Sequence, residues 1–243
     1  MKKNQNPKSN KKSNKNQNTK LKINKHPANP RIFSAGKNLI TPDLSPEYSV
    51  YQEEKITVNS HTYRVWDPYR SKLAAAILKG LTTVPLHKGD TVLYLGAATG
   101  TTASHISDIV GESGVVYCVE FSPTPCADLI ELAHNRKNIF PVLADAHTPV
   151  EYTFMVGGID MIYCDVAQPD QADIITKNAS LFLRSNGHLL HAVKASSIDA
   201  GASPATVYQS IVSDLSHTFS ILTTIPLDPY QKKHAMVWGR YTQ

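Results

Sequence analysis

Three carboxylates and one glycine turn have the residue types and the spacing to bind a single ligand. The turn Gly96–Thr102 (GAATGTT) follows an apolar run, and Glu120, Asp145 and Asp165 each follow a later apolar run. A carboxylate can accept hydrogen bonds from both hydroxyls of a ribose, and glycine lets the backbone approach a ligand closely. Any one of these acids could be a loop acid or a helix cap, but three at successive strand ends favour a binding edge.

The turn also limits the class of ligand. Its Gly-x-x-x-Gly spacing differs from the Gly-x-Gly-x-x-Gly fingerprint of dinucleotide sites, and it holds neither an arginine nor a lysine to bind a pyrophosphate. An adenosine-bearing ligand without a pyrophosphate therefore fits best, and S-adenosylmethionine is the obvious candidate. The same spacing disfavours an NAD-dependent oxidoreductase.

The three carboxylates meet only if a parallel sheet aligns the strand ends, and the pattern along the chain predicts such a sheet. Short, nearly all-apolar runs alternate with helix-like stretches, which is typical of repeated βα units. Two last strand-like runs without a helix between them predict an antiparallel C-terminal hairpin. We expect an α/β fold of the class I methyltransferase (Rossmann-like) type with a mostly parallel seven-stranded sheet, by analogy of fold. The expected strands are Thr91–Leu95, Val115–Val119, Ile139–Leu143, Asp160–Cys164, His188–Val193, Phe219–Ile225 and His234–Tyr241, and the expected helices are Ala103–Val110, Ala127–Lys137, Ala172–Leu183 and Pro204–Thr218.

The segment before this pattern predicts a small β-rich N-terminal subdomain at 32–66, followed by the methyltransferase domain at 67–243. Strand-like runs on both sides of Asn59-Ser60 predict a hairpin. Asp67 is expected to cap the next helix, with Pro68 at its first position.

The charge of the chain is concentrated at its N-terminus. The protein has 243 residues and a formal net charge of +5, yet residues 1–31 hold ten Lys and Arg and no acid. Residues 32–243 therefore carry 15 basic against 20 acidic residues, a net charge of −5. The Lys/Asn-rich stretch 1–31 has too little apolar surface to order, so a disordered tail is expected. Such a tail attracts polyanions or only keeps the chain soluble.

The cysteines and the apolar runs indicate the compartment of the protein and whether it binds zinc or a membrane. Cys118, Cys126 and Cys164 are too few and too irregularly spaced for a disulfide framework, and no Cys-x-x-Cys pair suggests zinc. A reducing compartment is the simplest interpretation. No run approaches the ~18 apolar residues of a membrane span, so no membrane partner is expected. The N-terminus lacks the apolar segment of a secretory signal, so none is expected.

Several stretches are similar to the fibrillarin family, the methyltransferases of box C/D guide-RNA particles, and in particular to its archaeal members. The similarity runs from about Asn29 to the C-terminus, and the DVAQPDQ motif is specific to that family. A Gly/Arg-rich N-terminal domain of the eukaryotic kind is absent, and Pro123–Cys126 (PTPC) departs from the family's basic or small polar residues. The similar stretches are Val92–Ser107 (VLYLGAATGTTASHIS), Gly114–Ser122 (GVVYCVEFS), Asp165–Gln171 (DVAQPDQ), Val193–Asp199 (VKASSID), His234–Gly239 (HAMVWG) and, in the form of the archaeal members, Tyr63–Leu81.

The resemblance implies guide-directed, site-specific 2′-O-methylation of ribose in rRNA and tRNA, with S-adenosylmethionine as methyl donor. It also implies a catalytic set and a row of cofactor contacts. Gly96 and Ala97 are added to the cofactor contacts because they belong to the glycine turn. The catalytic set is Lys72, Asp165, Lys194 and His234; the cofactor residues are Gly96, Ala97, Thr101, Thr102, Glu120, Phe121, Asp145, Ala146, Asp165, Val166, Ala167 and Gln168; no metal is expected.

This reaction needs help with a proton. A ribose 2′-hydroxyl is protonated at neutral pH, so it must lose its proton as the carbon–oxygen bond forms, and a nearby base accelerates such a step by roughly 10²–10⁴-fold. Lys194 is the base if its amine is neutral; otherwise it orients the hydroxyl and water takes the proton. Asp165 is expected to fix the Lys194 amine, and His234 to position the nucleotide.

Target selection is expected to come from partners, because the negative body opposes tight autonomous RNA binding. The resemblance implies a box C/D guide RNA paired with target rRNA or tRNA, a Nop-domain scaffold protein and a kink-turn-binding ribosomal-protein-like subunit. It favours a cytoplasmic particle, or a nucleolar one in a host with a nucleus. Two alternatives stay open: methylation of another acceptor such as a protein glutamine, and a non-catalytic ribonucleoprotein subunit. The basic residues expected near the site are Arg64, Arg70, Lys72, Lys232 and Lys233.

Overall fold

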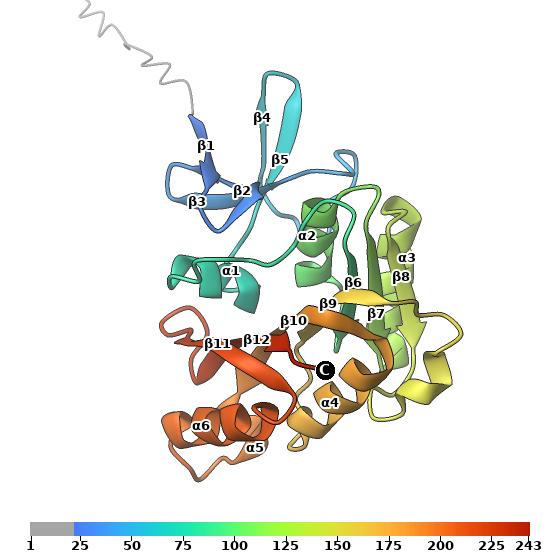
Figure 1. The fold of residues 1–243 in the computed structure, drawn as a ribbon. Coiled ribbons are helices and arrows are strands. Elements are labelled where there is room, and N and C mark those ends of the chain that lie inside the picture. Colours follow the sequence, from blue (N-terminus) through green and yellow to red (C-terminus); the bar gives the residue numbers. More distant parts are fainter. Residues whose placement is uncertain (1–21) are drawn as a thin grey trace, which may run out of the picture.

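The computed structural model describes residues 22–243 and contains the predicted sheet of seven strands (Figure 1). The strands are β6 (Thr91–Leu95), β7 (Val115–Glu120), β8 (Ile139–Leu143), β9 (Ile159–Cys164), β10 (Leu183–Lys194), β11 (Phe219–Pro226) and β12 (His234–Tyr241). Their order across the sheet is β11-β12-β10-β9-β6-β7-β8. The strands from β6 to β10 are parallel, and β12 and β11 form the antiparallel hairpin. The predicted α/β fold is confirmed.

Helices cover both faces of this sheet. They are α1 (Lys72–Leu78), α2 (Thr101–Val110), α3 (Pro123–Asn135), the 3₁₀ helix η1 (Pro149–Tyr152), α4 (Gln171–Phe182), α5 (Ala195–Ile198) and α6 (Pro204–Leu215). Successive strand side chains point to opposite faces. Tyr94 and Tyr163 therefore belong to the core formed with α1, α2 and α3, whereas Leu95 and Cys164 belong to the core formed with α4 and α6.

A second, antiparallel sheet lies above α1 and α2 in the view of Figure 1. Its strands are β1 (Ile23–His26), β2 (Asn29–Ala35), β3 (Asn38–Pro42), β4 (Lys55–Val58) and β5 (His61–Val65), in the order β1-β2-β3-β5-β4. Asn59 and Ser60 have positive φ at the predicted hairpin, as a tight β-turn requires. Leu39 and Trp66 are buried in the same core as α1 and α2, so this sheet packs directly on the methyltransferase fold.

The predicted end of the tail is wrong for residues 23–31, which form β1 and the first part of β2. Ala28 is buried, and the Asn29 side-chain amide donates to two backbone carbonyls after α1 at 2.6 and 3.0 Å. The composition of this segment did not predict a strand, because charged residues such as Lys25 occupy its exposed positions. The rest of the predicted tail, residues 1–21, lies outside the described residues.

A buried ion cluster joins the N-terminal sheet to α2 and α3. Asp108 accepts hydrogen bonds from Arg64 (2.7 Å) and from Arg136. Arg64 also pairs with Glu53 at 2.6 Å, and Arg136 pairs with Asp43 at 3.2 Å. All five side chains are buried. The expectation that Arg64 helps to hold RNA is therefore wrong, because its guanidinium lies inside the protein.

Removing the central acid of this cluster should destabilise the fold. The Asp108→Ala variant leaves the guanidinium groups of Arg64 and Arg136 with fewer buried partners, and breaking a buried pair costs about 3–5 kcal/mol. Urea unfolding should show this loss in the free energy of unfolding. The matched control is Asp173→Ala, which removes an exposed pair with Lys177 on α4 and should leave the unfolding midpoint almost unchanged. Equal effects of the two variants would contradict a stabilising role for the cluster.

The start of α1 differs from the prediction. Ser71 caps this helix: its Oγ accepts the N–H of the third helical residue at 3.4 Å and the hydroxyl of Thr102 at 3.0 Å. Asp67 instead accepts the N–H of Tyr69 at 2.8 Å, closing a local turn. Lys72 is therefore the first residue of α1.

Within residues 22–243, no helix is long and apolar enough to cross a membrane. The same residues contain no group of three or more His, Cys, Asp or Glu side chains that could hold a metal ion. Cys118, Cys126 and Cys164 are free and buried.

Candidate active site

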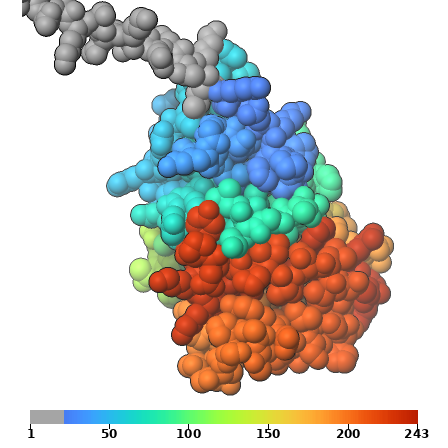
Figure 2. All heavy atoms as spheres, turned by 90° about the vertical axis from the view of Figure 1, so that its left-hand side faces the viewer, coloured from blue at the N-terminus to red at the C-terminus, as the bar shows by residue number. Residues whose placement is uncertain are grey.

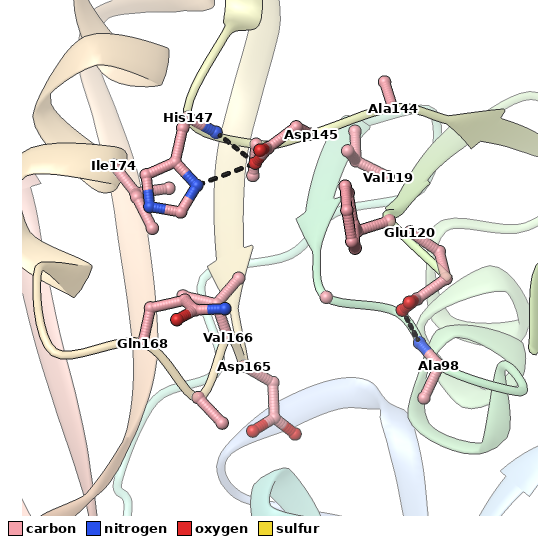
Figure 3. Close-up of a pocket in the computed structure, with 14 residues that line it drawn as sticks. Ala98, Val119, Glu120, Ala144, Asp145, His147, Asp165, Val166, Gln168 and Ile174 are labelled. Atoms are coloured by element: carbon pink, nitrogen blue, oxygen red, sulfur yellow. Dashed lines mark hydrogen bonds and ion pairs between the residues drawn. The ribbon is translucent and has the colours of Figure 1, made fainter. Parts of the chain in front are cut away.

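The carboxyl ends of β6, β7, β8 and β9 surround a cavity of about 390 Å³ (Figure 3). This volume lies in the range of small-molecule sites. The three predicted carboxylates line it, and in Figure 3 Glu120 lies across the cavity from His147 and Gln168. Most of the predicted cofactor residues belong to the lining: Gly96, Glu120, Phe121, Asp145, Ala146, Asp165, Val166, Ala167 and Gln168.

Gly96 lets two strand ends meet at the floor of the cavity. Its φ is +75°, and a Cβ at this position would lie 3.1 Å from the backbone carbonyl of Asp165. The Asp165 N–H donates to the carbonyl of Leu95 at 2.9 Å, which continues the β6–β9 pairing past the strand ends. A side chain at position 96 would therefore push Asp165 away from the site.

Glu120 is held in place by a backbone N–H group at each of its two carboxylate oxygens, one of them from the glycine turn. One oxygen accepts the N–H of Ala98 at 2.9 Å and the other accepts the N–H of Ser122 at 2.9 Å. An ionised carboxylate has about four acceptor positions, so Glu120 can still accept two hydroxyl groups. The neighbouring Phe121 is 71% exposed and offers an open aromatic face at the cavity.

Sequence reasoning missed His147, which bridges two carboxylates at the cavity. Its backbone N–H and its Nδ1 lie 2.9 and 2.7 Å from Oδ1 of Asp145, and its Nε2 lies 3.1 Å from Asp170. These bonds raise the pKa of His147 and lower the pKa of Asp145. Oδ2 of Asp145 has no hydrogen bond within the described chain and is free to accept one. A histidine two residues after a strand-end acid was the available signal.

The lining differs from the prediction in two ways. Ala97, Thr101 and Thr102 are not part of it; Ala97 is buried, and the Thr102 hydroxyl is bound to Ser71. Their contacts with a cofactor stay a prediction. The additional lining residues are Ala98, Val119, Ala144, His147 and Ile174, which are mostly small or apolar and carry little signal in a single sequence.

Asp165 forms an ion pair with Lys72 at the edge of the cavity. Lys72 Nζ lies 2.8 Å from Asp165 Oδ2, and the two side chains are 23% and 18% exposed. Burial raises the pKa of Asp165, and the ammonium of Lys72 opposes that rise. The expectation that Asp165 fixes the Lys194 amine is therefore wrong: its direct partner is Lys72, because α1 begins beside the end of β9.

Lys194 and His234 face each other at the same end of the sheet. Lys194 ends β10, His234 begins β12, and the two residues are paired in the antiparallel register. The N–H of Ala195 donates to the carbonyl of Lys233 at 3.1 Å and fixes this junction. The Lys194 ammonium makes no hydrogen bond or ion pair within residues 22–243, so it is free to contact a substrate.

The ring of His234 has a defined tautomer. Nδ1 lies 2.7 Å from the carbonyl oxygen of Lys232, which can only accept, so Nδ1 carries the proton and Nε2 is an acceptor. Burial is the main cause that holds the pKa of His234 below its ordinary value, and the charges of Lys72 and Lys194 also lower it. The hydrogen bond to the Lys232 carbonyl and the charge of Asp165 oppose this decrease without reversing it. His234 is therefore neutral at neutral pH.

The strand order with its closing hairpin and the cavity at the carboxyl ends define a class I methyltransferase. The family model for fibrillarin matches residues 23–243. This chain belongs to the fibrillarin family.

Three similar proteins illustrate the relationship. The fibrillarin-like rRNA/tRNA 2′-O-methyltransferase of Aeropyrum pernix is 47% identical over 202 residues, which cover 83% of this chain and 87% of that protein. The crystal structure of A. pernix fibrillarin with natively bound S-adenosyl-L-methionine has a TM-score of 0.84 and 43% identity, and the match covers 90% and 98% of the two chains. The structure of a fibrillarin/Nop5p complex has a TM-score of 0.79 and 39% identity, covering 87% and 97%.

Proposed function

We propose that this chain transfers the methyl group of S-adenosylmethionine to the 2′-hydroxyl of ribose in rRNA and tRNA, the reaction for which its relatives are named. The proposal rests on four side chains that lie close to one another beside the cofactor cavity: Lys72, Asp165, Lys194 and His234. A protonated sugar hydroxyl needs such a set of cations and acceptors. The alternative acceptor, a protein glutamine, would need less assistance from a base.

The residues of the cavity fit S-adenosylmethionine, which supplies an electrophilic methyl group on its sulfonium when bound. Glu120 would accept hydrogen bonds from the hydroxyls of its ribose, with both carboxylate oxygens already fixed by backbone N–H groups. The free oxygen of Asp145 would accept a hydrogen bond from the exocyclic amine of the adenine, and the exposed ring of Phe121 would pack against the adenine. Asp165 lies between this cavity and the Lys72 ammonium.

The structure supports a division of roles among the four catalytic residues. Lys72 is engaged in the ion pair with Asp165, so it is assigned to holding that carboxylate and not to accepting the proton. Lys194 orients the ribose hydroxyl and stabilises the negative charge that develops on its oxygen. His234 accepts the proton at Nε2, since its Nδ1 proton is committed to Lys232. The neutral imidazole is a much stronger base than water, and unlike an ammonium it needs no prior loss of a proton.

Replacing Lys194 tests the electrostatic role. The Lys194→Met variant keeps the length of the side chain and loses its charge, so methyl transfer should fall by about 10²–10³-fold, as when an oxyanion-stabilising group is removed. Calorimetry should show a dissociation constant for S-adenosylmethionine within a few-fold of the wild type. Lys177→Met, at an exposed position on α4, is the control and should not change the rate. Retained turnover in the Lys194 variant would remove this residue from the mechanism.

Target specificity is proposed to come from partners. The related fibrillarin/Nop5p complex supports a Nop-domain scaffold, and we extend this to a box C/D guide RNA and a kink-turn-binding subunit. The exposed cations next to the site, Arg70, Lys232 and Lys233, can hold a short strand but cannot read a sequence.

A reconstitution experiment tests the whole proposal. The chain alone and the chain with scaffold, kink-turn protein and guide RNA are each given target RNA and tritiated S-adenosylmethionine. Only the complete particle should methylate efficiently, at one ribose, and changing the pairing segment of the guide should redirect the methyl group. Efficient site-specific methylation by the chain alone would contradict the role of the partners. Failure of the complete particle would support the non-catalytic alternative.

The place of the particle in the cell remains part of the proposal. A cytoplasmic location follows from the archaeal relatives, and a nucleolar one would follow in a host with a nucleus. Microscopy of the tagged chain in its host distinguishes the two.

A further inference from the structure

A second cavity, of about 650 Å³, is lined by segments that lead directly into two residues of the proposed catalytic set. Its walls come from the N-terminal sheet, from the turn before α1 and from the loop between β11 and β12. That turn ends at Lys72 and that loop ends at His234, so the segments that supply two catalytic residues also supply Tyr69 and Tyr230 to the cavity. Figure 2 shows the C-terminal loop in red against the green segment around α1 on one continuous face.

The aromatic wall of this cavity is fixed in place. Gln231 Nε2 donates to the carbonyls of Pro68 and Tyr69 at 3.0 and 2.7 Å, which ties the loop to the turn. The rings of Tyr69 and Tyr230 meet edge to face with centroids 5.4 Å apart. Tyr69 is nevertheless 65% exposed, so one of its faces is open. A large aromatic ring that is both anchored and exposed is a platform for another flat group.

Two cations without an ion pair in the described residues line the cavity, and one of them lies beside the aromatic wall. Arg70 lies over the ring of Tyr51 at 5.6 Å, and Arg70 and Lys37 make no ion pair within the described chain. Of the acids in the lining, Glu53 pairs with Arg64, whereas Asp67 accepts only the neutral N–H of Tyr69 and keeps its charge. Glu54 is the remaining exposed acid of the lining, and its carboxylate can accept an exocyclic amine of a base.

We infer that this cavity binds an unstacked base of the RNA strand that enters the catalytic set, with Tyr69 and Tyr230 as the stacking platform and Arg70 toward the phosphates. The inference rests on the function proposed above. Proteins bind single-stranded RNA by stacking its bases on aromatic rings and arginine planes beside cations for the backbone. The cavity thereby adds binding energy for the acceptor strand without touching the cofactor.

Paired substitutions test this site in the reconstituted particle. Tyr69→Ala and Tyr230→Ala should each raise the KM for target RNA by about tenfold or more, since stacking on one ring contributes an effect of this size, with kcat and the cofactor dissociation constant within twofold. Tyr69→Phe and Tyr230→Phe keep the rings and should behave as wild type. Phe154→Ala removes an 84% exposed ring elsewhere and should change nothing. Circular dichroism checks the fold, and Tyr69, as the more exposed residue, keeps the test valid if Tyr230→Ala misfolds.

The outcomes separate this inference from the proposed function. An unchanged KM in the alanine variants, or an equal rise in the phenylalanine variants, overturns the stacking site. Loss of scaffold binding with normal RNA affinity also overturns it and marks the cavity as a protein interface. If the wild-type particle transfers no methyl group, the proposed function fails, and the cavity is tested instead by fluorescence anisotropy of labelled hexauridylate on the isolated full chain. Weaker binding by Tyr69→Ala than by Tyr69→Phe then supports the site, and equal binding overturns it.

Discussion

The Asp165→Ala variant is expected to lose methyl transfer by more than about 10²-fold and also to bind S-adenosylmethionine more weakly. Of the four proposed catalytic residues, Asp165 is the one that also lines the cavity. Without its carboxylate the Lys72 ammonium, which is largely buried, loses its partner and leaves its position. Calorimetry with the cofactor and a tritium-transfer assay in the reconstituted particle measure the two effects separately.

Two further variants make this prediction specific. Asp165→Asn keeps the shape of the side chain and loses the charge, so it should restore much of the cofactor affinity and little of the rate. Asp160→Ala lies near the opposite end of β9, where Asp160 pairs with Arg184 and accepts the N–H of Thr91 at 2.8 Å. It should affect stability only. Normal binding and turnover in Asp165→Ala would refute the placement of the active site.

His234→Ala should slow methyl transfer by roughly 10²–10⁴-fold, the usual contribution of a general base. The pH dependence provides the sharper test. The pKa of His234 lies below its ordinary value, chiefly because of burial, so the wild-type rate should be constant near neutral pH and fall as acid protonates Nε2. We call this decrease at acidic pH the acid limb of the rate profile. The variant lacks the titrating group, so its low residual rate should show no acid limb.

The measurement is the single-turnover rate of the particle between mildly acidic and neutral pH. His61→Ala, at the exposed tip of the β4–β5 hairpin, is the control and should retain both the rate and the acid limb. An acid limb that persists in His234→Ala would assign the titration to another group. A variant with full activity would return the role of base to Lys194 or water.

Most secondary structure of the large sheet could be predicted because it depends on local patterns. β6 and β8 have the predicted bounds, and β7 and β9 differ by one residue at one end. Nearly all-apolar runs of five or six residues between helix-like stretches leave few alternatives to a parallel sheet. The N-terminal boundary was less predictable, since a few buried positions such as Ala28 among many lysines give a weak signal.

The sequence by itself determined which residue types reach the site, because a carboxylate or amine directly after an apolar strand must lie at the carboxyl edge of a parallel sheet. Glu120, Asp145 and Asp165 follow from that rule. Only the tertiary structure decided the partner of each side chain. The contact between Lys72 and Asp165 spans 93 residues of chain, and it depends on where α1 begins and how it packs, which no local pattern encodes. The burial of Arg64 inside an ion cluster has the same origin.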